Sequence, residues 1–243
     1  MSDELDVWFE EELPPVEAVV EENVKALAYR DSLSHEQAEQ QVRTIAQGIL
    51  RVDKPRWQLL DAAEHKVLPS RGDGHFYFVR LGFQFDLTEE GRQESAQFTY
   101  ARCEAYLWPV EGSAMPTVYE ILPRDLYDGE PRQVHVEFGP QIKLGDVGGS
   151  IGKISTDFSV GRVEPVVVGF TGENERAPYW DLRPKSKSIL GVRHLWLIIE
   201  SPNNCGGIRL ATRVQGDIET HFGPIPIGPK NRQWESRPSI VIK

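Results

Sequence analysis

Tyr179, Trp180 and Asp181 place two aromatic rings beside a carboxylate, the combination that a sugar-binding subsite uses. The rings would form a stacking platform, and the carboxylate would accept hydrogen bonds from hydroxyl groups. A hydrolase would need a second carboxylate close in space, which spacing along the chain does not reveal. The alternative is an aromatic plug at one end of a β-sandwich, and we favour this alternative for these three residues.

The glycine-rich stretch GDVGGSIGK (145–153) matches a phosphate-binding P-loop only in part. The position required for the first glycine is Val147, and Lys153 is followed by Ile154 instead of serine or threonine. The flanking residues read as strands, so no helix N-terminus is available to hold phosphate. A hairpin turn is the better interpretation, and we expect no cofactor.

The cysteines and histidines give little support for catalysis or metal binding. Cys103 falls inside an expected strand, where a free thiol packs as a small hydrophobe, and Cys205 falls in a glycine-rich turn where we expect more exposure. The six histidines are scattered and show no metal-ligand spacing, so we expect no metal site. The sequence predicts no catalytic residue, and it leans towards a non-enzyme while leaving the question open.

The strongest functional signal is the acidic and aromatic N-terminal segment, residues 1–15. Nine of the 37 carboxylates lie in residues 1–24, which hold no lysine or arginine, so the rest of the chain is nearly neutral, with 28 acidic against 27 basic residues. Apolar groups in this segment could enter a groove of a partner protein while the acids steer towards a basic rim. The candidate partner-binding residues are Leu5, Trp8, Phe9 and Leu13. The alternative is a segment that docks on its own body as an added edge strand.

Composition narrows the class of partner. The net charge is −10 and the pI is about 5.2, so we expect no nucleic acid, since phosphate binding needs clustered lysine and arginine. No apolar run approaches the length that spans a bilayer, so we expect no membrane partner. The sequence also shows no secretory signal pattern, and we expect a cytoplasmic protein with reduced thiols.

Helical periodicity is confined to the first third of the chain. Apolar residues recur at helical spacing over 16–30 and again over 34–51, and Ser34 with Gln37 has the spacing of a capping box. The short connection between these two segments predicts a helical hairpin. A third short helix is expected over 56–66.

The pattern changes to period two from residue 75 onwards, which predicts strands. Residues 133–138 alternate cleanly, as a half-buried strand does, whereas 194–200 are apolar on both faces, which predicts a central strand. The expected strands are 75–85, 96–108, 117–122, 133–138, 189–200, 207–215 and 238–243, with others within 150–170. Short turns rich in glycine, proline and asparagine join them.

These observations predict a mainly β chain: an antiparallel β-sandwich, or a distorted barrel, with an N-terminal α-helical hairpin. The expected organisation is an N-terminal segment (1–15), a helical segment (16–68) and a β domain (70–243). We interpret the protein as a non-catalytic interaction or adaptor module, a bacterial accessory protein that docks through its N-terminal segment and a β-sandwich surface. The competing hypotheses are a hydrolase with its site at one end of the sandwich and a self-assembling structural protein that forms homo-oligomers.

Overall fold

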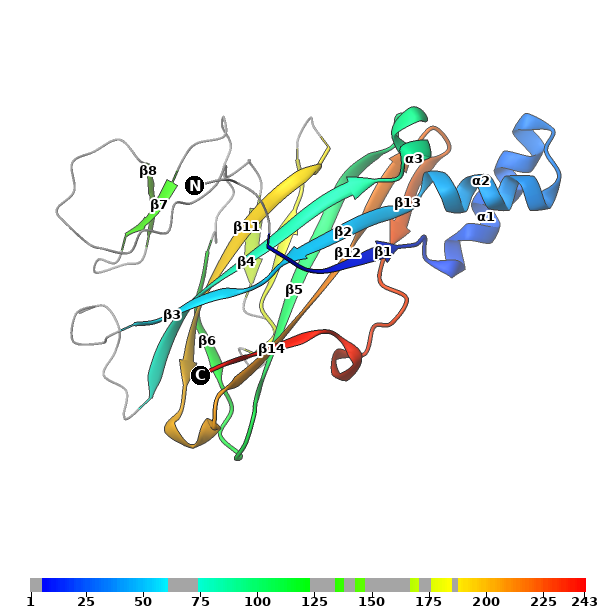
Figure 1. Cartoon of the computed structure of the whole chain (residues 1–243). Helices are drawn as coiled ribbons and strands as arrows, with labels where there is room; N and C mark the ends of the chain where they lie inside the picture. The colour runs from blue at the N-terminus through cyan, green and yellow to red at the C-terminus, as the bar shows by residue number, and fades with distance from the viewer. Residues whose placement is uncertain are drawn as a thin grey trace.

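The structure, a computed structural model, describes residues 6–60, 74–122, 134–137, 143–146, 167–170, 176–184 and 188–243. Within these residues the chain is mainly β, and two antiparallel six-stranded sheets pack against each other (Figure 1). Three α-helices accompany the sheets in the described part of the chain, and two of them project from one end of the sandwich. The predicted β-sandwich with an N-terminal helical hairpin is confirmed.

Sheet A has the strand order β1-β2-β4-β11-β6, and β3 also pairs with β4. Its strands are β1 (Val7–Leu13), β2 (Gly48–Asp53), β3 (Arg56–Leu60), β4 (His75–Leu87), β6 (Thr117–Leu122) and β11 (Gly191–Ser201). β2 and β3 follow one another along the same edge of β4, so the long strand β4 holds the chain's first strands in place. β11 is central, between β4 and β6.

Sheet B has the strand order β13-β12-β5-β10-β9, and β14 also pairs with β12. Its strands are β5 (Gln97–Pro109), β9 (Val167–Phe170), β10 (Tyr179–Leu182), β12 (Ile208–Thr220), β13 (Gly223–Ile227) and β14 (Ser239–Ile242). β5 and β12 are both thirteen residues long and pair over almost their whole length. A separate antiparallel pair is formed by β7 (Val134–Glu137) and β8 (Lys143–Asp146).

The core lies between the two sheets because alternate residues of each strand point inward. On β5 the buried residues Phe98, Ala101, Cys103, Ala105 and Leu107 belong to one hydrophobic cluster that also includes residues of β4 and β11. The intervening residues of β5 are partly exposed on the outer face. In the middle of β11, residues 195–199 are buried on both faces, which confirms the prediction of a central strand.

The helical hairpin consists of α1 (Glu17–Asp31) and α2 (His35–Ile45). The capping box is present, because the Ser34 side chain accepts from the backbone N–H of Gln37 and the Gln37 side chain accepts from the backbone N–H of Ser34. The apolar stripes of the two helices pack on each other and on Ile225 of β13. The third helix, α3 (Glu89–Gln93), is a short turn capped by Thr88 and joins β4 to β5.

Two sequence predictions in this region are wrong. The helix expected over 34–51 ends at Ile45, and the chain then enters β2 at Gly48. The helix expected over 56–66 is a strand in its described part, β3 at Arg56–Leu60. Both corrections have one cause: these residues find a hydrogen-bonded neighbour in β4, and tertiary pairing outweighs local helical spacing.

Candidate functional site

The N-terminal segment, the strongest signal in the sequence, is the edge strand β1 of sheet A. It pairs antiparallel with β2, and Pro15 forms an isolated bridge to Ile227 of β13 in sheet B. Leu13 is 0% exposed, while Trp8 and Phe9 are half-buried and pack on the main core. Leu5 lies outside the described residues. Leu13 therefore has no surface to offer a partner, and the alternative interpretation, an edge strand added to the chain's own body, describes residues 7–13.

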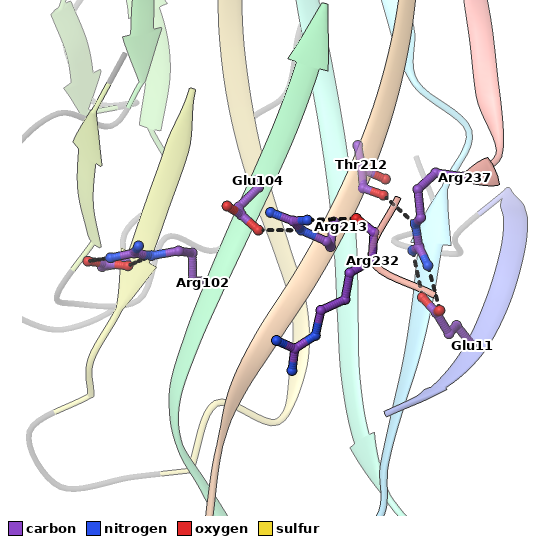
Figure 2. A network of polar contacts seen from close by, with 8 residues as sticks. Glu11, Arg102, Glu104, Thr212, Arg213, Arg232 and Arg237 are labelled. Atoms are coloured by element: carbon purple, nitrogen blue, oxygen red, sulfur yellow. Dashed lines mark hydrogen bonds and ion pairs between the residues drawn. The ribbon is translucent and has the colours of Figure 1, made fainter. Parts of the chain in front are cut away.

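Glu11 of β1 is a largely buried carboxylate, and it is compensated by an ion pair with Arg237. Its carboxylate accepts two hydrogen bonds from the guanidinium of Arg237, at 2.5 and 2.6 Å, and both side chains are largely buried (Figure 2). Arg237 also donates through Nε to the carbonyl oxygen of Thr212 on β12 at 3.1 Å. The pair therefore links β1 of sheet A to β12 of sheet B. Its two neighbours pair nearer the surface, Glu10 with Arg51 and Glu12 with Lys230.

The second candidate, Tyr179, Trp180 and Asp181, is divided by the pleat of β10. Trp180 points into the core and is fully buried, so it offers no platform to a ligand. Tyr179 and Asp181 lie on the outer face of sheet B, beside β5. The structure therefore separates the three residues that the sequence places together, and only two of them face the same side.

Asp181 is held by three hydrogen bonds from β5. Arg102 donates to both of its oxygens, at 2.7 and 2.9 Å, and the hydroxyl of Tyr100 donates to one of them at 2.7 Å. Burial alone would raise the pKa of Asp181, but the hydrogen bonds from Arg102 and Tyr100 outweigh it, and the pKa is lowered. The pKa of Tyr100 is raised, first by burial and then by its bond to the carboxylate. The carboxylate is a structural ion-pair partner whose two oxygens are both occupied.

We expect Asp181→Asn to lower the free energy of unfolding by about 1–3 kcal/mol at neutral pH, because hydrogen bonds to a charged group are lost. The folded-state pKa of Asp181 lies below its ordinary value, so this stabilisation is present above that value and disappears as the pH falls through the folded pKa. The difference from the wild type should therefore shrink in urea titrations as the pH is lowered below 3.8, the ordinary pKa of an aspartate. Glu219→Gln is the control, and a difference for Asp181→Asn that stays constant across this range would contradict the assignment.

The outer face of β5 and its neighbours carries a set of stacked arginine and aromatic side chains. Arg213 of β12 donates to Glu104 at 2.7 Å and to the backbone carbonyl of Arg232, as Figure 2 shows. The guanidinium of Arg213 also lies over the ring of Trp234, which comes from the short helix η3 (Trp234–Ser236) and stacks on Tyr106. These contacts hold large polar and aromatic groups in fixed positions at the surface.

The same arrangement recurs towards β10. Arg102 lies over the ring of Tyr179 at 4.3 Å, and Arg183 lies over the ring of Tyr100 at 5.0 Å. We call this surface the sheet B face. It comprises Tyr100, Arg102, Glu104, Tyr106 and Trp108 of β5, Tyr179 and Asp181 of β10, Arg209, Arg213, Gln215, Asp217 and Glu219 of β12, and Arg183 and Trp234.

The sheet B face could be found in the sequence only in part. The alternation of residues 96–108 predicts that Tyr100, Arg102, Glu104, Tyr106 and Trp108 share one side of a strand. What they meet depends on the register of β5 with β12 and on the return of residue 234 from the far end of the chain. No local pattern specifies those two facts.

The other candidates from the sequence do not bring catalytic or metal-binding groups together among the described residues. Both cysteines are free and buried; Cys103 lies in the core as predicted, but the expectation that Cys205 is more exposed is wrong, because its thiol is enclosed and donates to the carbonyl of Gly207. Most of the stretch 145–153 lies outside the described residues. Among the described residues, no group of three or more His, Cys, Asp or Glu side chains could hold a metal ion. An open depression of about 390 Å³ lies between α2 and α3, lined mainly by glutamine and glutamate side chains.

Comparison with known proteins gives no family. No family model matches the sequence, and no curated protein matches it. Among solved structures the chain is similar to Clostridium perfringens delta-toxin, with 7% identity over 82% of this chain and 88% of that chain and a TM-score of 0.35. It is also similar to the Clostridium perfringens NetB toxin in its membrane inserted form (9% identity, 81% and 94%, TM-score 0.33) and to a structure described as a pore forming protein (8%, 81% and 90%, 0.34). At these scores the likeness carries no argument about function.

None of the helices in the described part of the chain is long and apolar enough to cross a membrane.

Proposed function

We propose that this chain is a non-catalytic protein-interaction module that docks through the sheet B face. The observation that carries the proposal is the density of partly exposed tyrosine, tryptophan and arginine side chains on one sheet surface, all of them except Arg209 held by stacking or by a hydrogen bond. These are the residue types enriched at the energetic centres of protein interfaces. Because contacts within the chain already fix their positions, docking costs less conformational entropy than it would for free side chains.

The N-terminal segment has a supporting role in this proposal. β1 closes the sandwich, and its Glu11 holds Arg237, which directly follows the short helix η3 that carries Trp234. The acidic strand therefore helps to position Trp234 of the docking surface, while its own apolar residues pack on the core of the sandwich. This differs from direct docking through residues 5–13, and it places the contact surface on the β-sandwich.

The hydrolase alternative rests on Asp181 and Asp217, which flank β5 on the same face. Burial raises the pKa of Asp217, opposed by the charge of Arg183, whereas the pKa of Asp181 is lowered, and such divergence is typical of an acid–base pair. However, Asp181 would have to release Arg102 and Tyr100 before it could act on a substrate. The interaction module needs no such rearrangement, so we favour it.

The proposal predicts that Trp234→Ala removes binding while the fold persists. Tagged wild-type protein and the variant would be incubated with a lysate of the native host, and captured proteins would be quantified by mass spectrometry. We expect at least about a tenfold loss of the specific partner for Trp234→Ala, since truncating an interface tryptophan costs 2 kcal/mol or more.

Tyr29→Ala is the matched control, because Tyr29 is an aromatic residue 92% exposed on α1, outside the sheet B face. It should capture the same protein as the wild type. Equal capture by Trp234→Ala and wild type, with both folded by circular dichroism, would contradict docking through the sheet B face.

A further inference from the structure

Three side chains form a row across sheet A on its outer face. Arg80 of β4 lies directly opposite Arg56 of β3 on one side and directly opposite Trp196 of β11 on the other. Val79 and Leu81, the chain neighbours of Arg80, belong to the main core, so the pleat places Arg80 and its two partners on the face turned away from sheet B. Adjacent strands are about 4.8 Å apart, so the row spans only about 10 Å. We call these three residues the Arg80 row.

Two like charges face each other in the Arg80 row. Arg56 and Arg80 are cross-strand partners, and like charges in directly opposite positions destabilise a sheet. The pKa of Arg80 is lowered, first by burial and then by the charge of Arg56, and the nearby carboxylate of Asp53 offsets this only in part. Arg56 forms no ion pair and no side-chain hydrogen bond with the described residues. Two cations therefore share one carboxylate, and one further negative charge would neutralise the group.

Two buried N–H groups of the Arg80 row have no acceptor. The side chain of Arg80 is 12% exposed, and its Nε–H is enclosed without a hydrogen-bond partner among the described residues. The same holds for the indole N–H of Trp196, a residue that is 0% exposed. Buried donors are almost always paired, because an unpaired donor loses its hydrogen bond to water and gains none in return. Two such donors in directly opposite positions indicate a site for a ligand with acceptor oxygens.

Asp53 orients the Arg80 guanidinium but leaves its Nε–H for a second acceptor. One carboxylate oxygen of Asp53 accepts from the backbone N–H of Asp6 at 2.9 Å, and the other accepts from Nη2 of Arg80 at 3.0 Å. The Asp53 side chain is also confined against Gly82, where an added Cβ atom would come within 2.7 Å of the Cβ of Asp53. The guanidinium is therefore held in place by contacts within the chain, and such preorganisation favours the binding of a ligand.

We propose that the Arg80 row binds an oxyanion, the carboxylate or phosphate group of a small molecule. An oxygen of this group accepts from Nε of Arg80 and from the indole N–H of Trp196, and the exposed guanidinium of Arg56 contacts the anion from the solvent side. Hydrogen bonds between a guanidinium and an oxyanion are charge-assisted, and the geometry of arginine suits them. One ligand thus supplies both the missing acceptor and the missing negative charge. The row lies on sheet A, so this inference does not depend on docking through the sheet B face.

The test follows the indole N–H resonance of Trp196 in the NMR spectrum of the isotope-labelled, full-length chain, assigned by its loss in Trp196→Phe. Sodium phosphate and sodium acetate are titrated separately at constant pH, with sodium chloride at matched ionic strength as the reference. We expect a saturable shift of this resonance with phosphate, with acetate or with both, and none with chloride. The anion that binds more tightly identifies the chemical class of the ligand.

Arg56→Gln distinguishes an anion site from a purely structural row. Arg56 is exposed, so we expect this variant to keep its fold and to bind the anion about tenfold more weakly in calorimetry. Arg232→Gln is the matched control, because Arg232 is an exposed arginine beyond β13 and its replacement removes the same charge. It should bind like the wild type. Trp196→Phe keeps a buried ring but lacks the donor, and it should also bind about tenfold more weakly.

Three results would overturn the proposal. The first is a Trp196 resonance that neither phosphate nor acetate shifts more than chloride does. The second is equal affinity of Arg56→Gln and Arg232→Gln, with both folded by circular dichroism. The third is full affinity of Trp196→Phe. If Trp196→Phe does not fold, the comparison of Arg56→Gln with Arg232→Gln decides by itself, because both of these substitutions are at the surface.

Discussion

Replacing Glu11 by glutamine should lower the free energy of unfolding by about 3–5 kcal/mol, the cost of leaving a buried charge without its partner. Arg237 is 4% exposed at its side chain and Glu11 is 19% exposed, so water cannot substitute for the lost carboxylate. The bond from Arg237 to the carbonyl of Thr212 remains but supplies no charge. Urea denaturation at neutral pH measures the change directly.

The adjacent acid provides a matched control. Glu12 is 61% exposed and lies 3.6 Å from Lys230, which is 74% exposed, so Glu12→Gln should change stability by less than about 1 kcal/mol. Equal losses for the two variants would mean that the general acidity of β1 matters and the buried pair does not. A third variant, Glu11→Leu with Arg237→Met, should recover most of the lost stability, because replacing both partners by apolar groups removes the uncompensated charge.

The Glu11 pair also explains why the N-terminal segment was the hardest part to interpret from the sequence. Three consecutive glutamates within a run of acids resemble a solvated segment, yet Glu11 finds its partner 226 residues away. Alternation places Phe9, Glu11 and Leu13 on one side of β1, but the pattern does not show that Arg237 lies on that side and pairs with Glu11. Sequence spacing reports local periodicity, and contacts between distant segments are set by the tertiary fold.

Elements with a clear period were predicted well. β4, β5 and β6 lie close to the ranges that the period of two predicted, β11 lies where residues apolar on both faces predicted a central strand, and the capping box at Ser34 marks the start of α2. β12 begins as predicted but continues to Thr220, beyond its expected end at residue 215. Two short strands were missed, β3 with five residues and β10 with four, because so few residues do not distinguish a period of two from a helical turn. The candidate site followed the same rule, since the β5 side of the sheet B face could be inferred from alternation whereas its contacts with Arg213 and Trp234 could not.

Trp180→Ala should cost about 3–5 kcal/mol, the usual range for truncating a large aromatic residue in a packed core. Trp180 is 0% exposed between the two sheets, with Cys103 and Gly169 as its neighbours across the strands, so truncation opens a cavity that cannot fill with solvent. Trp180→Phe should cost less, because the indole N–H is buried without an acceptor among the described residues and phenylalanine removes that donor.

Tyr179 is the control that separates a core role from a ligand-binding role for this pair. It is half-exposed on the sheet B face under the guanidinium of Arg102, so Tyr179→Ala should lose only about 1 kcal/mol, the value of an exposed cation–π contact. If Trp180→Ala left the melting temperature unchanged, Trp180 would not be a core residue. Residues 179–181 would then again be candidates for a sugar-binding subsite. A large loss for Trp180→Ala beside a small loss for Tyr179→Ala means that the pleat of β10 assigns one aromatic residue to stability and its neighbour to the docking surface.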